Sequence, residues 1–79
     1  MNKVLIIDDE EKLRQLLTRI ISLEGFTVLE ASNLATASTV LAKENIAVIL
    51  CDVKLPDGNG VDFVKQVKPK YPAIEIILL

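Results

Sequence analysis

Three aspartates follow two apolar runs of the sequence and could together bind a divalent cation. Asp8 and Asp9 come directly after residues 4–7, and Asp52 comes directly after residues 47–51. Such runs are typical of buried parallel strands, whose carboxyl ends meet at one edge of a sheet, where α/β folds bind ligands. Carboxylates crowded at that edge repel one another, and a hard cation such as Mg²⁺ relieves the repulsion. The pattern therefore predicts a Mg²⁺ site built around a carboxylate that can take a phosphoryl group.

Each aspartate taken alone also has an ordinary structural explanation. Asp8 and Asp9 could cap a helix and fill its first turn, and Asp52 could begin a turn. The combination favours a metal site, because two adjacent acids close one apolar run and a third closes the run expected beside it. Oxygen ligands agree with Mg²⁺, since the chain has no histidine and its one cysteine, Cys51, belongs to an apolar run.

The residues around the aspartates exclude several other chemistries. The turn Asp8-Asp9-Glu10 is acidic where dinucleotide and P-loop folds need glycine-rich backbone beside a phosphate. Without histidine there is no Ser-His or Cys-His catalytic pair. Lys54 and Pro56 occupy positions that an EF-hand loop fills with calcium ligands. Two interpretations of Lys54 stay open: a solvated loop lysine, or a cation that leans over a bound phosphate.

Length and composition describe one small folded domain. The chain has 79 residues, of which 51% are hydrophobic, and a formal net charge of −2. Because the charged residues are scattered along the chain, we expect no direct nucleic-acid binding. No apolar run approaches the roughly 20 residues needed to span a bilayer, so we expect no membrane-spanning segment. The lone Cys51 cannot form an internal disulfide, and we see no cleavable basic N-terminal region, so we expect a reduced, cytoplasmic location.

Hydrophobic periodicity predicts strands alternating with helices. Strands are expected at residues 3–7, 26–30, 46–51 and 74–79, and helices at 11–24, from Ser32 or Asn33 to Asn45, and at 61–67. Residues 54–60 are expected to form a rigid loop, and Pro69 and Pro72 to force the chain out of helix. This order predicts a doubly wound α/β fold with a parallel sheet, right-handed crossovers and helices on both faces.

Apolar side chains recur at helical spacing in the first two predicted helices, and those of the second helix are expected to point toward a core. They are Leu13, Leu16, Leu17, Ile20, Ile21 and Leu23 in the first helix, and Leu34, Ala37, Val40 and Leu41 in the second. Acidic residues in the first turn suit the positive end of the first helix, and Gly25 supplies its stop.

An acidic pair after the first strand, an aspartate after the third, then Leu55-Pro56 and Gly60 form a joint pattern in register along the whole chain. The pattern resembles the receiver domain of bacterial two-component response regulators. The resemblance implies a flavodoxin-like sheet with strand order 2-1-3-4-5. It also implies a signalling domain that catalyses its own phosphorylation and dephosphorylation rather than an enzyme with a separate substrate.

The resemblance assigns a role to each site residue. Asp52 matches the nucleophile that accepts a phosphoryl group from the phosphohistidine of a sensor histidine kinase, or from small phosphodonors. Asp9 matches the direct Mg²⁺ ligand and Asp8 the second acid, which acts through metal-bound water. Asp52 and the backbone carbonyl of Val53 complete the expected metal ligands, and Pro56 and Gly60 shape the loop beside the site.

The same resemblance implies that residues 1–79 are a partial receiver domain, truncated after the fourth strand. Expected but missing are the fourth helix, fifth strand and fifth helix, together with a Ser or Thr after the fourth strand and a Lys after the fifth. Impaired phosphorylation and no productive switching are therefore expected, with Mg²⁺ binding retained. The fourth strand would be an open edge and one sheet face half bare, which favours self-association.

Two alternative functions come from other classes. One is a non-catalytic βα assembly fragment that dimerises through the exposed fourth strand and the uncovered sheet face, its acids serving only to cap and solubilise one edge. The other is a hydrolytic site of the haloacid-dehalogenase type. That family places its nucleophile on the first strand in an Asp-x-Asp arrangement, whereas Asp8 and Asp9 are adjacent.

Overall fold

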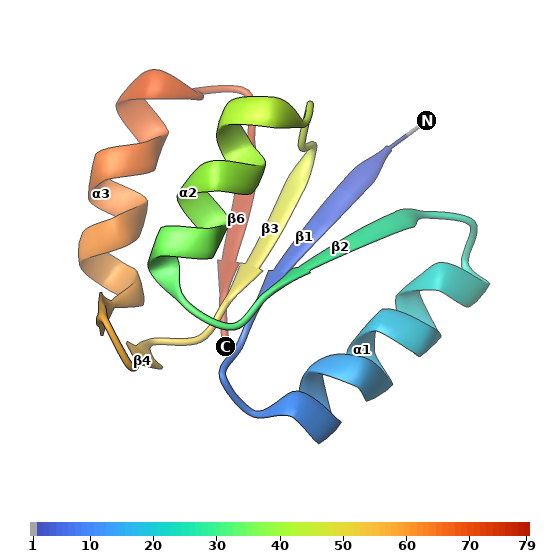
Figure 1. Ribbon diagram of the computed structural model, residues 1–79. Coiled ribbons are helices and arrows are strands. Elements are labelled where there is room, and N and C mark those ends of the chain that lie inside the picture. Colours follow the sequence, from blue (N-terminus) through green and yellow to red (C-terminus); the bar gives the residue numbers. More distant parts are fainter. Residues whose placement is uncertain (1) are drawn as a thin grey trace.

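Four parallel strands form the central sheet of the computed structural model, which describes residues 2–79 (Figure 1). In chain order the elements are β1 Lys3–Ile7, α1 Glu11–Leu23, β2 Thr27–Ala31, α2 Leu34–Lys43, β3 Val48–Cys51, β4 Lys54–Leu55, β5 Gly58–Asn59, α3 Gly60–Lys70 and β6 Glu75–Leu78. Helices α2 and α3 lie side by side on one face of the sheet, and α1 covers part of the other (Figure 1). The predicted doubly wound α/β class is confirmed.

The sheet order is β2-β1-β3-β6, so the strands predicted as second, first, third and fourth follow one another as expected. All three neighbouring pairs are parallel. Ile7 is level with Ala31 on one side and with Cys51 on the other, and Cys51 is level with Leu78. The carboxyl ends of β1 and β3 therefore finish flush, and the residues that follow them meet at one edge.

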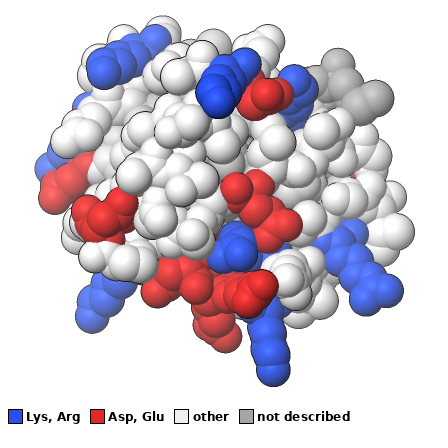
Figure 2. All heavy atoms as spheres, viewed as in Figure 1, with Lys and Arg blue, Asp and Glu red and all other residues white. Residues whose placement is uncertain are grey.

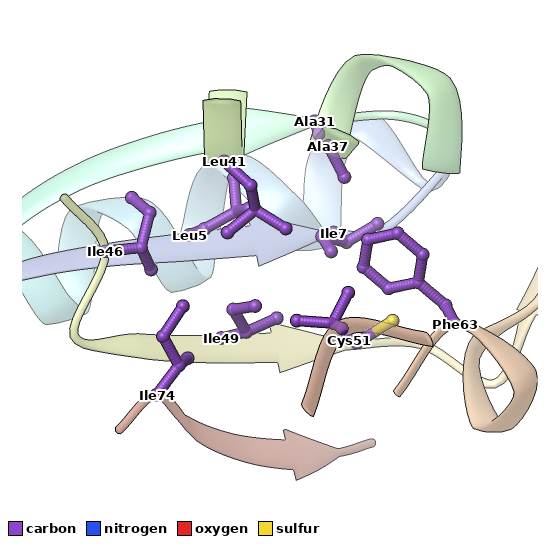
Figure 3. Close-up of a cluster of buried hydrophobic side chains, with 11 residues drawn as sticks. Leu5, Ile7, Ala31, Ala37, Leu41, Ile46, Ile49, Cys51, Phe63 and Ile74 are labelled. Atoms are coloured by element: carbon purple, nitrogen blue, oxygen red, sulfur yellow. The ribbon is translucent and has the colours of Figure 1, made fainter. Parts of the chain in front are cut away.

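The main hydrophobic core lies between the sheet and helices α2 and α3. In Figure 3 the ring of Phe63, from α3, projects over the carboxyl ends of β1 and β3 toward Ile7 and Cys51. The buried members are Leu5, Ile7, Ala31, Ala37, Leu41, Ile46, Ile49, Cys51, Phe63, Val67 and Ile74. In β1 the alternate residues Val4 and Ile6 are also buried, as expected for a strand covered on both faces.

The apolar side chains of α1 recur at the predicted helical spacing, but the sheet face beneath them is only partly covered. No residue of α1 is buried, and Leu16 and Ile20 are 54% and 51% exposed. The sheet face on that side opens progressively, from fully buried Ile6 in β1, through half-buried Leu50 in β3, to Ile77 in β6, which is 52% exposed. One helix is too narrow to cover four strands, so this face stays partly open.

Local capping explains where the helices begin and end. The side chain of Asn33 accepts a hydrogen bond from the Thr36 amide and starts α2, as one of the two predicted caps. Gly25, at a φ of 92°, follows α1 and supplies the predicted stop. Helix α2 ends at Lys43 rather than at the predicted Asn45, because Glu44 is already extended.

Two predictions about the C-terminal half need correction. Pro69 lies inside α3, which runs from Gly60 to Lys70 rather than over 61–67. A proline removes only one backbone donor, and the Tyr71 amide still reaches the Val67 carbonyl at 2.9 Å, so the last turn closes. Residues 54–60, predicted as a rigid loop without strands, contain the antiparallel two-residue strands β4 and β5. No helix within residues 2–79 is long and apolar enough to cross a bilayer.

Candidate functional site

The three aspartates named from the sequence converge at the carboxyl edge of the sheet. Asp8 and Asp9 follow β1 and Asp52 follows β3, and one carboxylate oxygen from each lies within 4.8 Å of the others. Figure 2 shows acidic side chains gathered at the same lower edge of the molecule, below the strand ends seen in Figure 1. A separation of this size lets all three carboxylates share one cation.

Asp8 is the buried member of the cluster, with 2% of its surface exposed. Its amide donates to the Ala31 carbonyl at 3.0 Å, and its Oδ1 accepts from the Glu10 amide at 2.9 Å. Among residues 2–79 no lysine or arginine pairs with its carboxylate. Because an ionised carboxylate is costly to bury without a counter-charge, the chemistry of this donor set fits a hard divalent cation.

Asp9 and Asp52 complete the cluster from more accessible positions. Asp9 is exposed and Asp52 is partly buried. The Asp52 amide donates to the Ile7 carbonyl at 2.9 Å, which ties the end of β3 to the end of β1. One carboxylate oxygen, Asp52 Oδ1, accepts from the Val53 amide at 2.9 Å. In the described chain the second oxygen makes no hydrogen bond, so it is free for chemistry.

Cys51 lies beneath the aspartates but is not equipped to bind the metal. Burial, followed by the negative charges of Asp52 and Asp8, raises the pKa of the Cys51 thiol to about 11. The thiol therefore stays protonated at neutral pH, and it donates to the Asp52 carbonyl oxygen at 3.2 Å. A metal ligand must be a thiolate, so Cys51 acts as a core residue.

The segment after Asp52 is held against α3 by a close backbone approach. The Gly60 amide donates to the Val53 carbonyl at 2.7 Å, so one lone pair of this predicted metal ligand is already used. A Cβ atom on Gly60 would collide with the Asp52 carbonyl oxygen and would lie 3.1 Å from Cys51 Sγ. Only glycine allows α3 to begin here, which explains one residue of the predicted pattern.

Two residues beside the site were not identified from the sequence. Arg14 Nη1 donates to the Asp8 carbonyl at 2.7 Å, and Arg14 Nε donates to Glu30 Oε1 at 2.8 Å. Asp57, between β4 and β5, accepts from the Leu34 amide at 2.8 Å and from the Ala35 amide at 3.0 Å. These backbone hydrogen bonds hold the Asp57 pKa below its ordinary value.

No local pattern could have linked these residues to their partners. Arg14 and Glu30 lie 16 positions apart, and Asp57 lies 23 positions from Leu34. The side chain of Lys54, the candidate phosphate-binding lysine, is exposed and makes no hydrogen bond or ion pair within residues 2–79.

A family profile and curated proteins match nearly the whole chain. A family profile described as the response regulator receiver domain matches residues 4–79. The hydrogenase transcriptional regulatory protein HoxA of Cupriavidus necator is 37% identical over 76 residues, covering 96% of this chain and 16% of HoxA. Sporulation initiation phosphotransferase F of Bacillus subtilis is 31% identical over 98% of this chain and 62% of its own length.

Solved structures share the fold. The response regulator TrrA from Thermotoga maritima, in complex with Mg²⁺-BeF, superposes with a TM-score of 0.92 at 27% identity, covering 99% of this chain and 68% of TrrA. The present chain thus spans less than two thirds of the length of the two curated relatives named above.

Proposed function

The chain belongs to the response regulator receiver domain family, and on that premise we propose that Asp52 is its phosphoacceptor. Asp8, Asp9 and Asp52 are the proposed Mg²⁺ ligands, with the Val53 carbonyl as a further ligand through its second lone pair. The observation that carries the proposal is the meeting of three carboxylates within 4.8 Å at the ends of β1 and β3. Bound Mg²⁺ would offset the charge of the carboxylates and of the phosphoryl oxygens.

The proposed reaction is a transfer of a phosphoryl group to the free oxygen of Asp52. The carboxylate oxygen forms a bond to phosphorus, and the donor's bond to phosphorus breaks with its electron pair leaving on the donor atom. That atom is a histidine nitrogen when the donor is a sensor histidine kinase, and a carboxylate oxygen when it is acetyl phosphate. The proposed product is an aspartyl phosphate on Asp52.

Properties of two similar proteins support this proposal. The Bacillus subtilis relative is named a phosphotransferase, and the Thermotoga maritima neighbour binds Mg²⁺-BeF. A sensor histidine kinase and small phosphodonors are accordingly the partners we propose. The proposal keeps the cytoplasmic location expected from the sequence.

Charge near Asp52 sets the expected rate of transfer. Within residues 2–79 no lysine or arginine forms an ion pair with Asp52. The Arg14 guanidinium is hydrogen-bonded to the Asp8 carbonyl and to Glu30 instead. Mg²⁺ and the exposed Lys54 side chain are then the positive charges available to an incoming phosphoryl group, which is itself anionic. We therefore propose that this 79-residue chain binds Mg²⁺ but is phosphorylated slowly.

Intact mass after incubation with Mg²⁺ and acetyl phosphate tests the proposal. One added phosphoryl group in the wild type, and none in Asp52→Asn or in the absence of Mg²⁺, is the expected result at long incubation. Asp57→Asn is a matched control, because it removes one aspartate charge outside the three-aspartate cluster. An adduct that persists in Asp52→Asn would refute the assignment of the nucleophile.

A second candidate function is assembly, which the open sheet face favours. Strand β6 is the last strand of the sheet, and Ile77 and Leu78 are 52% and 40% exposed. An apolar edge strand with free backbone groups can pair with a second copy. Mg²⁺ titration together with sedimentation, both performed on wild type and Asp9→Ala, separates the two functions. Loss of Mg²⁺ affinity in Asp9→Ala supports the metal site, whereas a metal-independent dimer supports assembly.

A further inference from the structure

Arg14 reaches the metal-binding turn without belonging to the three-aspartate cluster. We propose that Arg14 is a positioning residue that orients the Asp8–Asp9 peptide for cation binding, an inference that rests on the proposed Mg²⁺ site. Its guanidinium makes two directed hydrogen bonds, one to the Asp8 carbonyl oxygen at 2.7 Å and one to Glu30 Oε1 at 2.8 Å. The Arg14 side chain is only 14% exposed.

The anchor on β2 gives Arg14 a fixed position. Glu30 is level with Ile6 of β1, so its side chain lies on the sheet face that α1 covers. Arg14 is in the first turns of α1, and its guanidinium therefore joins three elements: the helix, β2 and the turn after β1. A largely buried guanidinium held at two points has little freedom, so it can set the direction of the carbonyl that it contacts.

The peptide group explains why this contact concerns Asp9. The Asp8 carbonyl and the Asp9 amide belong to one planar peptide group. A fixed direction of the carbonyl therefore also fixes the direction of the Asp9 N–Cα bond. The Asp8 amide and carboxylate have their own partners, the Ala31 carbonyl and the Glu10 amide. Asp9 is exposed and makes no hydrogen bond of its own within the described residues. Its orientation thus depends on the preceding peptide plane.

Electrostatics and positioning predict opposite effects for removal of Arg14. A positive charge beside a cation site repels the cation, so charge alone predicts that Arg14→Gln binds Mg²⁺ more tightly. Positioning predicts weaker binding, because residues that hold metal ligands typically change metal affinity about 10-fold or more when replaced. Arg14→Lys keeps the charge but cannot span both acceptors with a rigid fork, so only positioning predicts a loss for that variant.

Calorimetric titration with Mg²⁺ alone tests the proposal on wild type, Arg14→Gln, Arg14→Lys and the control Arg19→Gln. Arg19 is exposed on the same helix and has no ion-pair partner among residues 2–79. We expect Kd to rise about 10-fold in Arg14→Gln, by a smaller factor in Arg14→Lys, and not to rise in Arg19→Gln. Arg14→Lys keeps the test valid if Arg14→Gln fails to fold. Unchanged or tighter binding in both Arg14 variants would overturn the proposal.

A metal-free measurement separates this inference from the proposed function. The Asp9 amide resonance of the ¹⁵N-labelled protein without Mg²⁺ is expected to shift in Arg14→Lys and to stay in place in Arg19→Gln. If the wild-type chain fails to bind Mg²⁺ while the Asp9 resonance still shifts in Arg14→Lys, the metal site is refuted and the positioning geometry stands. An unshifted resonance would overturn the positioning role whether or not Mg²⁺ binds.

Discussion

Replacing Gly60 with alanine tests whether the close approach of α3 to Asp52 shapes the site. The added Cβ would collide with the Asp52 carbonyl oxygen and sit 3.1 Å from both the Asp52 carbonyl carbon and Cys51 Sγ. The atoms it meets cannot retreat easily. The Asp52 amide is bonded to the Ile7 carbonyl at 2.9 Å, and the Gly60 amide is bonded to the Val53 carbonyl at 2.7 Å. Relieving the collision must therefore lengthen at least one of these bonds.

The expected cost follows from two opposing effects. Overpacking a well-filled interior costs about 1–3 kcal/mol. At a glycine with a backbone conformation that alanine accepts, the same replacement stabilises by about 0.4–1 kcal/mol. Gly60 has no positive φ, so both effects apply. We expect Gly60→Ala to lower the free energy of unfolding by on the order of 1–2 kcal/mol, and to weaken Mg²⁺ binding because the displaced backbone carries Asp52.

Urea denaturation followed by circular dichroism, combined with Mg²⁺ titration, checks both effects. Gly25→Ala is the matched control. Gly25 has a φ of 92° and nothing within 4 Å of an added Cβ, so alanine there strains only the backbone. That variant should lose about 1 kcal/mol or more of stability without a change in Mg²⁺ affinity. A Gly60→Ala protein as stable as the wild type, with unchanged Mg²⁺ affinity, would refute the reasoning.

Three further predictions concern the surroundings of the site. Asp57→Asn should reduce the loss of stability on acidification, because the lowered pKa of Asp57 gives stability that is present above the unfolded-state pKa and disappears as pH falls through the folded-state value. Urea midpoints measured from neutral to acid pH check this, and parallel curves for wild type and variant would contradict it. Phe63→Ala should cost about 3–5 kcal/mol, because it empties the core above β1 and β3, and a urea midpoint within error of the wild type would rule that out. Cys51, with its pKa raised to about 11, should react with iodoacetamide in the native protein far more slowly than in urea, which mass spectrometry measures; equal rates would contradict burial of the thiol.

Element order and the aspartate cluster were predictable because their signals are local. An apolar run followed by acids marks the end of a buried strand, and parallel strands with right-handed crossovers bring such ends together. Asp8, Asp9 and Asp52 therefore could be grouped from the order of residues alone, and their meeting within 4.8 Å confirms that grouping. Asn33 and Gly25 also kept their predicted capping positions, because a cap depends on neighbours three or four residues away.

In α1 and α3 the sequence pattern was not sufficient, for two different reasons. The helical spacing of Leu16 and Ile20 in α1 is genuine, but spacing cannot tell whether another element covers that face, and here both side chains are exposed. Pro69 was expected to end α3 because its missing donor is a local property. The helix continues past it because the Tyr71 amide reaches the Val67 carbonyl, a bond that composition cannot reveal.

The amino-acid order determined which chemistry is available: three carboxylates at two strand ends, with oxygen ligands and no histidine. Tertiary structure alone decided how these groups are held. Arg14 meets Glu30 across 16 positions, and Asp57 meets the amino end of α2 across 22 and 23 positions. Such contacts arise only when the sheet register has placed distant segments side by side, because hydrogen bonds are directional and short-ranged while sequence patterns report only near neighbours.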